Sequence, residues 1–169
     1  MPNWYLVGMM GSGKTATGRR LAFLLGCSFL DLDQLIEEKT GRTVVEIFAR
    51  EGEAFFRDVE AGVLREVSGT GPRVIAAGGG TVLRADNVAR MRQSGKVIFL
   101  EAALETLWER VKDKKDRPLL KGADPKKALE EIFLARKNFY ESASDLKVQT
   151  DGQSPEEVAK KIFELLKTT

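Results

Sequence analysis

The feature that most constrains this chain is a glycine-rich octapeptide near its beginning. Residues 8–15 read Gly-Met-Met-Gly-Ser-Gly-Lys-Thr, which matches the pattern G-x-x-x-x-G-K-[ST]. The apolar run 4–7 predicts a buried strand directly before it, and residues 14–25 predict a helix directly after it. In that context the glycines let backbone amides turn inward around phosphate oxygens, and the helix N-terminus adds partial positive charge. The alternative, a glycine turn with an incidental lysine, is disfavoured by the strand-loop-helix context.

Two side chains of this loop carry specific expectations. Lys14 should reach the β- and γ-phosphates of a bound nucleotide, and the Thr15 hydroxyl should hold Mg²⁺. The loop therefore predicts a site for a nucleoside triphosphate and its magnesium ion.

Short apolar runs alternate with helical patterns along the whole chain. Such alternation predicts right-handed β-α-β units, so we expect an α/β protein with a parallel sheet covered by helices on both faces. The 169 residues contain no linker or repeat and fit a single domain, residues 1–169. The strands are expected at 4–7, 28–32, 74–77, 96–101 and 146–149, and the helices at 14–25, 34–39, 51–67, 86–94, 104–112, 124–142 and 154–166.

Composition excludes several classes of function. The chain has 27 basic and 25 acidic residues, a net charge of +2, which argues against a partner such as nucleic acid or a membrane surface. No apolar run reaches the length of a membrane-spanning helix. Because the chain has no histidine, it cannot hold a Ser-His-Asp triad. The one cysteine, Cys27, is expected to be a small buried hydrophobe in a reducing compartment.

Two carboxylates follow the second predicted strand. In the sequence Asp31-Leu32-Asp33, period-two alternation would point both carboxylates to the same side of the strand. Ligands bind at the C-terminal ends of strands in open α/β sheets, where the glycine loop also lies. One carboxylate could bind Mg²⁺ through water, and the other could accept the proton of an attacking hydroxyl. A helix N-cap at Asp33 and a solvated loop at Asp31 are the structural alternatives.

Two arginines are predicted on apolar helix faces. Arg136 is surrounded at helical spacing by apolar side chains, and Arg57 follows two phenylalanines, with Glu60 three residues on to orient it. A buried guanidinium needs an anion, so the pair could converge on one substrate carboxylate. Two structural salt bridges are the alternative. The apolar neighbours of Arg136 are Leu129, Ile132, Phe133, Phe139 and Tyr140.

Two further segments could approach a ligand. Gly78-Gly79-Gly80 follows a buried strand, where close approach by a ligand is a better reason for three glycines than a simple turn. The segment 112–124 is highly charged, and we interpret it as a mobile lid that brings Arg117 onto the transferred phosphoryl group. The Pro118-Leu119-Leu120 sequence favours a lid over a solvated loop.

Together these motifs resemble the shikimate kinase family, within the nucleoside-monophosphate-kinase-like P-loop fold. The resemblance covers essentially the whole chain. It rests on the octapeptide, Asp31-Leu32-Asp33, Phe56-Arg57 with Glu60, the three glycines, residues 117–120, and Arg136 before Tyr140. It implies a three-layer P-loop kinase fold, with a five-stranded sheet in the order 2-3-1-4-5 and a substrate-binding helical region at about 33–60.

The resemblance also implies roles for individual residues. Lys14, Asp33 and Arg117 would be catalytic, and Thr15, with Asp31 through water, would form the Mg²⁺ site. Shikimate would contact Asp33, Arg57, Gly78, Gly79, Gly80 and Arg136, with both arginines on its carboxylate. ATP would contact Met10, Gly11, Ser12, Gly13, Lys14, Thr15, Arg110, Arg117, Gln153 and Pro155. Gln153 stands where members of the family often have arginine, so this position departs from the family's pattern.

The implied activity is transfer of the ATP γ-phosphoryl group to the 3-hydroxyl of shikimate, a step of chorismate biosynthesis. The expected partners are therefore shikimate and ATP, with Mg²⁺ as cofactor. The resemblance also implies a monomer in the cytoplasm, or in the plastid stroma if a transit peptide has been removed. The alternatives are another small-molecule P-loop kinase, for gluconate or a nucleotide, and a non-catalytic binding protein with the same fold.

Overall fold

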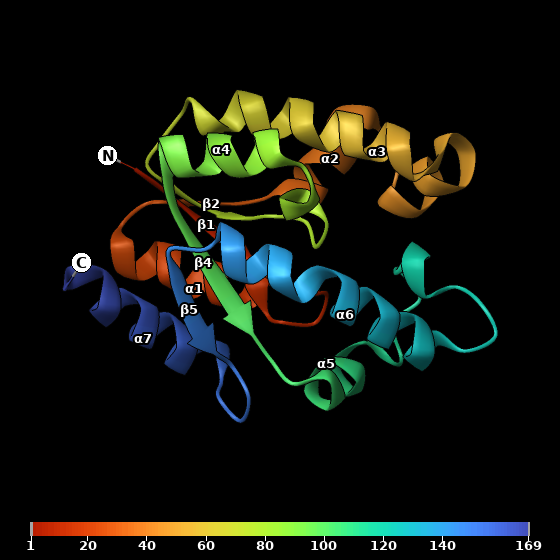
Figure 1. Cartoon of the computed structure of the whole chain (residues 1–169). Helices are drawn as coiled ribbons and strands as arrows, with labels where there is room; N and C mark the ends of the chain where they lie inside the picture. The colour runs from red at the N-terminus through yellow and green to blue at the C-terminus, as the bar shows by residue number, and fades with distance from the viewer. Residues whose placement is uncertain (1, 169) are drawn as a thin grey trace.

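The five strands that the structure describes run parallel in one sheet. The computed structural model describes residues 2–168 and has the strand order β2-β3-β1-β4-β5, which confirms the order implied by the resemblance (Figure 1). The C-terminal ends of the strands therefore meet at one edge, where the loops that follow them can build a common site. The strands are β1 Asn3–Val7, β2 Ser28–Asp31, β3 Arg73–Ala76, β4 Gly95–Glu101 and β5 Leu146–Gln149.

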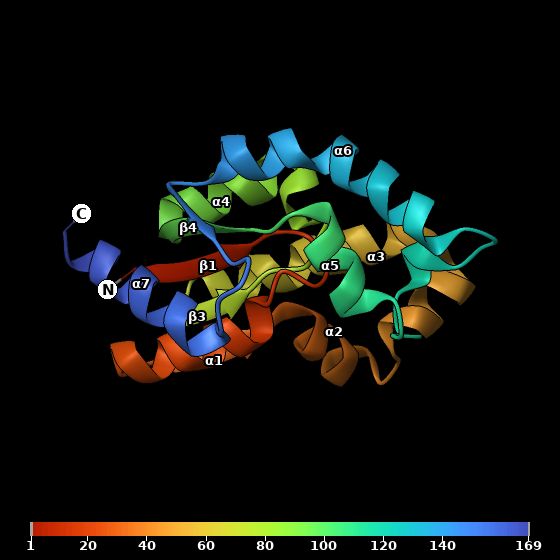
Figure 2. The ribbon, with the colours of Figure 1, turned by 90° about the horizontal axis from the view of Figure 1, so that it is seen from below.

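Helices cover both faces of the sheet and make the fold a three-layer sandwich. Figure 2 shows α1 and α7 below the sheet, with α4 and α6 above it. Each face encloses an apolar core, one under α1 and α7 and a larger one under α3, α4 and α6. The helices are α1 Lys14–Leu25, α2 Leu32–Thr40, α3 Val44–Ser68, α4 Ala85–Ser94, α5 Leu104–Val111, α6 Pro125–Ala143 and α7 Pro155–Lys167, with short 3₁₀ turns η1 Thr81–Leu83 and η2 Pro118–Leu120.

Helix α3 begins earlier than the sequence pattern indicated. The prediction started this helix at residue 51, whereas α3 begins at Val44 and bends at Gly52, whose φ of 86° favours glycine. Its start is fixed by a capping box in which Thr43 and Glu46 satisfy each other's backbone amides. The prediction therefore missed the helical segment that precedes the bend.

Helix α2 also changes the expected geometry of the two aspartates. Strand β2 ends at Asp31, which caps α2 by accepting a hydrogen bond from the backbone amide of Gln34 at 3.2 Å. Asp33 lies in the first turn of that helix. The expectation of strand alternation across both residues was therefore wrong, as was the alternative that Asp33 is the cap.

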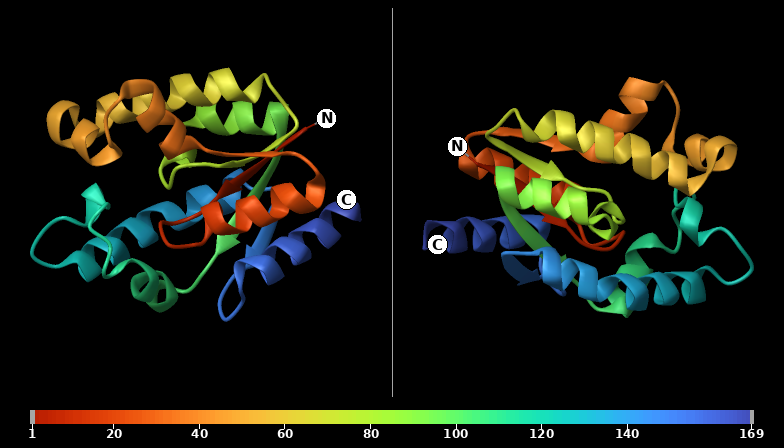
Figure 3. Two further views of the ribbon diagram at one scale, coloured as in Figure 1. Left: turned by 180° about the vertical axis from the view of Figure 1, so that it is seen from behind. Right: turned by 45° about the horizontal axis from the view of Figure 1, so that its top comes forward.

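The segment 112–124 lies beside the bend of α3. Figure 3 shows η2 and the first part of α3 facing each other at the same end of the molecule, and η2 also packs against α6. Leu120 is buried, while Leu119 faces the cleft described below. Among residues 2–168, no helix has both the length and the apolar character that a bilayer crossing requires.

Candidate active site

A cleft of about 1050 Å³ opens at the C-terminal edge of the sheet. Its walls come from the glycine loop, the start of α2, both parts of α3, the three glycines after β3, the segment 112–124 and α6. The structure thus brings together most of the residues that the sequence singled out. Those in the lining are Met10, Gly11, Gly13, Lys14, Thr15, Asp31, Asp33, Arg57, Gly78, Gly79, Gly80, Arg110, Arg117 and Arg136.

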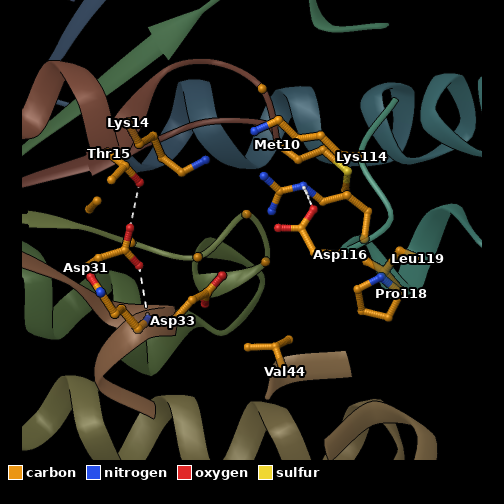
Figure 4. A pocket seen from close by; sticks show the side chains of 18 of the residues that line it. Met10, Lys14, Thr15, Asp31, Asp33, Val44, Lys114, Asp116, Pro118 and Leu119 are labelled. Carbon is orange, nitrogen blue, oxygen red and sulfur yellow. Dashed lines mark hydrogen bonds and ion pairs between the residues drawn. The ribbon is translucent and has the colours of Figure 1, made fainter. Parts of the chain in front are cut away.

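The side chains of Lys14 and Thr15 in the glycine loop are both hydrogen-bonded to the protein itself. The Lys14 ammonium donates to the carbonyl oxygens of Gly8 and Met9, at 2.8 and 3.0 Å. The Thr15 hydroxyl donates to a carboxylate oxygen of Asp31 at 2.6 Å, a contact drawn in Figure 4. Burial lowers the pKa of Lys14 to about 8, although the nearby Asp33 carboxylate works in the opposite direction.

Asp33 is the carboxylate that lacks partners. Its Oδ1 atom is buried and has no hydrogen-bond partner among the described residues. Burial raises the pKa of Asp33 to about 6, and the neighbouring Glu60 and Asp31 carboxylates add to the effect. Such a group is ionised at neutral pH and can still accept a proton readily, as a general base must.

Arg57 is held by two carboxylates of its own helix. Its Nη1 donates to Glu60 Oε1 at 3.0 Å, and its Nη2 donates to Glu53 Oε1 at 3.3 Å. Glu60 is fully buried, whereas the Glu53 side chain is 46% exposed. The Nε atom of Arg57 is buried without a hydrogen-bond partner in the part of the chain described. The arginine is therefore firmly oriented and still has a donor to offer.

Arg136 lies on α6 and is as buried as Arg57, but it is paired differently. Within residues 2–168 it forms no ion pair, and Tyr140, one turn further on, is the polar neighbour that interacts with it. The Tyr140 hydroxyl donates to the Gly79 carbonyl oxygen, and burial raises the pKa of Tyr140 to about 12. Phe139, which was expected on the same apolar face, is instead 45% exposed.

The three glycines bring these charged groups into one place. A Cβ atom at Gly80 would collide with the Arg57 guanidinium, and one at Gly78 would collide with the Glu60 carboxylate. At Gly79 a Cβ would come within 3.4 Å of the Arg136 Nη1 atom. At Gly78 and Gly80 the side chains of the site itself therefore already occupy the space that a Cβ would need, whereas the contact at Gly79 would be an ordinary van der Waals one.

Arg117 enters the cleft from the segment 112–124. Its Nε atom is buried and lacks a hydrogen bond within the described chain, and the Asp116 carboxylate lies 3.8 Å away. Its positive charge lies near enough to Lys14 and Asp33 to lower the pKa of each. Lys114 and Lys115, which the sequence analysis did not single out, line the same wall.

The expected ATP contacts divide into two groups. Arg110 lines the cleft and donates from Nη1 to the Gly11 carbonyl oxygen at 3.0 Å, which ties α5 to the glycine loop. Ser12 is buried in the loop, and its hydroxyl has no hydrogen-bond partner among residues 2–168. Gln153 and Pro155 lie at the start of α7, outside the lining of the cleft. Their contact with a nucleotide stays a prediction.

Sequence reasoning missed two contacts around Arg57 and Glu60. The Glu53–Arg57 pair has helical i,i+4 spacing, so the sequence did contain a signal for it. The bond from the Thr81 hydroxyl to Glu60 Oε2, at 2.8 Å, joins residues 21 apart and has no local signal.

Fold and site together define a P-loop phosphotransferase. One cleft, at the C-terminal edge of the parallel sheet, is lined by four features. They are a glycine loop of the phosphate-binding type, its lysine, a carboxylate without a hydrogen-bond partner and two buried arginines. This class of enzyme transfers the terminal phosphoryl group of a nucleotide to an acceptor bound beside the loop.

Comparison with known proteins narrows the class to one family. Residues 10–167 match the family model described as shikimate kinase. The chain is 46% identical over 166 residues to the shikimate kinase of Symbiobacterium thermophilum, covering 97% of this chain and 95% of that protein. The shikimate kinase of Moorella thermoacetica is 45% identical over 165 residues, with 98% and 94% covered.

Solved structures agree with this result. The shikimate kinase of Acinetobacter baumannii in complex with shikimate superposes with a TM-score of 0.97 at 39% identity, covering 99% of this chain and 94% of that one. The Aquifex aeolicus shikimate kinase gives a TM-score of 0.85 at 35% identity, with 98% and 96% covered. The chain therefore belongs to the shikimate kinase family, whose members are ATP-dependent kinases.

Proposed function

We propose that the protein transfers the γ-phosphoryl group of ATP to the 3-hydroxyl of shikimate. The observation that carries the proposal is the pair of buried arginines, Arg57 and Arg136, against Gly80 and Gly79 in the cleft that also contains Asp33. Paired guanidinium groups hold a carboxylate by charge-assisted hydrogen bonds, each contributing about 1.5–3 kcal/mol. The acceptor is therefore a hydroxylated carboxylic acid.

Asp33 is proposed to orient the acceptor hydroxyl and take its proton. The hydroxyl oxygen attacks the γ-phosphorus, the bond to the β–γ bridging oxygen breaks, and ADP leaves with the bridging oxygen. The proton passes to the Asp33 carboxylate, whose pKa of about 6 keeps it ionised at neutral pH.

Lys14 and Arg117 are proposed to stabilise the negative charge of the transferred group. Both side chains line the cleft, and their charges already influence Asp33. To bind phosphate, Lys14 must exchange its bonds to the Gly8 and Met9 carbonyls for bonds to the nucleotide. Preorganised cations in a cleft closed to water would then stabilise the transition state.

The Thr15 hydroxyl and the Asp31 carboxylate fit a site for Mg²⁺. Their oxygens lie 2.6 Å apart at the end of the glycine loop, and Mg²⁺ prefers hard oxygen donors. When bound, the ion would neutralise phosphate charge. No group of three or more acidic, histidine or cysteine ligands occurs in residues 2–168, so most of its remaining ligands would be water and phosphate.

Three expectations accompany the proposal. We propose that residues 112–124 act as a mobile lid on a single domain, with residues 33–60 forming the acid-binding region. We also propose a monomer, because one chain by itself lines the cleft with both the glycine loop and the two buried arginines. A cytoplasmic location fits the free thiol of Cys27, with the plastid stroma as the alternative.

The decisive measurement is ADP release with Mg-ATP and one acceptor at a time. Shikimate should support turnover, while gluconate and AMP should not. Turnover with gluconate or AMP alone would identify another small-molecule kinase, and no turnover with any acceptor would favour a binding protein. In a complex with shikimate, an absence of any anion between Arg57 and Arg136 would overturn the assignment of the substrate.

A further inference from the structure

We propose that Thr81 is a positioning residue for the substrate carboxylate, acting through Glu60 on Arg57. The inference rests on the proposed function. Thr81 is fully buried and directly follows the three glycines, and its hydroxyl donates to Glu60 Oε2 at 2.8 Å. The other oxygen of the same carboxylate accepts from Arg57 Nη1 at 3.0 Å.

Glu60 needs both bonds because it is fully buried. A carboxylate out of contact with water is stable only if its oxygens are satisfied by donors. With Thr81 bound to one oxygen, the carboxylate plane is fixed and the second oxygen faces Arg57. Without the hydroxyl, the carboxylate would rotate to share the arginine between its two oxygens.

Thr81 is itself held in place from the opposite side. The Asn87 side chain, also buried, donates to the Thr81 carbonyl oxygen at 3.0 Å, and the Thr81 amide donates to the Gly78 carbonyl at 3.2 Å. Hydrogen bonds thus connect α4, through the η1 turn, to Glu60 and Arg57. The position of the Thr81 hydroxyl is set by the fold and does not depend on a bound ligand.

The consequence appears at the Arg57 guanidinium. Glu60 fixes its Nη1 atom and Gly80 packs against its face, so the plane of the group is determined. The Nε–Nη2 edge remains, with Nε unpartnered in the described chain and Nη2 paired only to the half-exposed Glu53. That edge can hold a carboxylate through two parallel hydrogen bonds, provided its orientation is kept.

The test is Thr81→Val, which keeps the shape of the side chain and removes its hydroxyl. We expect the KM for shikimate to rise at least about fivefold, while kcat and the KM for ATP stay within about twofold, because one charge-assisted contact is misoriented. Thr81→Ser should restore the shikimate KM. Thr70→Val is the matched control, since it removes a hydroxyl bonded to the Val67 carbonyl at the far end of α3 and should leave both KM values unchanged.

Three outcomes would overturn the inference: an unchanged shikimate KM in Thr81→Val, a parallel rise in the KM for ATP, or no recovery in Thr81→Ser. If Thr81→Val does not fold, Thr81→Ala carries the same expectation. Calorimetric titration with shikimate separates this inference from the proposed function. If the wild-type protein binds no shikimate, both the proposed function and the inference are refuted. If the wild type and Thr81→Val bind shikimate equally tightly, only the inference is refuted.

Discussion

The two sides of the cleft handle charge in opposite ways. On the nucleotide side, Lys14 is bonded to carbonyl oxygens of its own loop, and Thr15 is bonded to Asp31. On the acceptor side, Asp33 and Arg57 have buried polar atoms without partners, and Arg136 pairs with no carboxylate in residues 2–168. The Lys14 and Thr15 side chains of the glycine loop are thus paired before any ligand arrives, although the buried Ser12 hydroxyl is not. On the acceptor side, Asp33 itself is unpaired.

This difference suggests where binding energy is used. A nucleotide must exchange existing bonds for new ones, so its net gain per contact is modest. A carboxylic acid with a hydroxyl group would satisfy donors and an acceptor whose desolvation cost is already present in the folded protein. Variants on the acceptor side should therefore affect function and stability in opposite directions.

The largest expected effect comes from Asp33→Asn. The amide cannot take a proton from the acceptor, so turnover should fall by about a thousandfold or more while the fold is retained. Shikimate-dependent ADP release measures the loss, and circular dichroism checks the fold. Asp58→Asn is the matched control, because Asp58 is exposed and pairs with Arg84 outside the cleft. Near-normal turnover in Asp33→Asn would remove this residue as the base.

The next effect separates the two sides directly. Arg136→Lys should weaken shikimate binding by about 10–100-fold, because a lysine cannot make two parallel hydrogen bonds to one carboxylate. The dissociation constant for ATP should stay within about twofold of the wild-type value. Isothermal titration calorimetry with each ligand gives both constants. Arg84→Lys, an exposed change, serves as the control. Equal losses for shikimate and ATP would contradict the division between the two sides.

Features that depend on residues close together in the sequence were predicted better than features that depend on distant residues. The strand-loop-helix around the glycine loop and the parallel sheet depend on local motifs and on the rules of β-α-β connection, and the structure confirmed both. The strand order, also confirmed, was implied by the family resemblance alone. The start of α3 at Val44 was missed, although the capping-box pattern of Thr43 and Glu46 indicates it. The bend at Gly52 was missed as well. The sequence signal for the start of α3 was therefore present but was not used in the prediction.

The acceptor side was harder to predict because its geometry is not local. The sequence indicated that Arg57 and Arg136 are buried, but nothing in it showed that each would pack against a different glycine of the same triplet. The Thr81–Glu60 bond joins two elements distant in the chain, so no spacing rule reveals it. Even Asp33 was chosen with the wrong local geometry, since it lies in a helix rather than a strand.

A third prediction concerns stability and pH. The folded-state pKa of Asp33, about 6, is higher than the ordinary value of 3.8, so the folded protein binds the proton more tightly. The free energy of unfolding should then decrease as pH rises from about 4 to about 6, and this cost should be complete above pH 6.5. Asp33→Asn should be more stable than the wild type by about 1–3 kcal/mol at pH 7.5, and no more stable at pH 4.

Urea denaturation at the two pH values measures this difference without any ligand. Asp58→Asn again provides the control, because its exposed carboxylate should give a difference of less than about 0.5 kcal/mol at either pH. If Asp33→Asn were less stable than the wild type at pH 7.5, the acceptor side would carry no cost of the kind described above.

The smallest expected effect tests which partner of Arg57 is permanent. Glu53 is half exposed and pairs with Nη2 at 3.3 Å, and exposed ion pairs contribute about 0.2–1 kcal/mol. Glu53→Gln should therefore change the dissociation constant for shikimate by less than about threefold. Glu60→Gln, which replaces the fully buried partner, should weaken binding at least about tenfold, because Arg57 loses its fixed anchor. Calorimetry on both variants gives the ratio, and a larger effect for Glu53→Gln would mean that the exposed carboxylate orients the arginine.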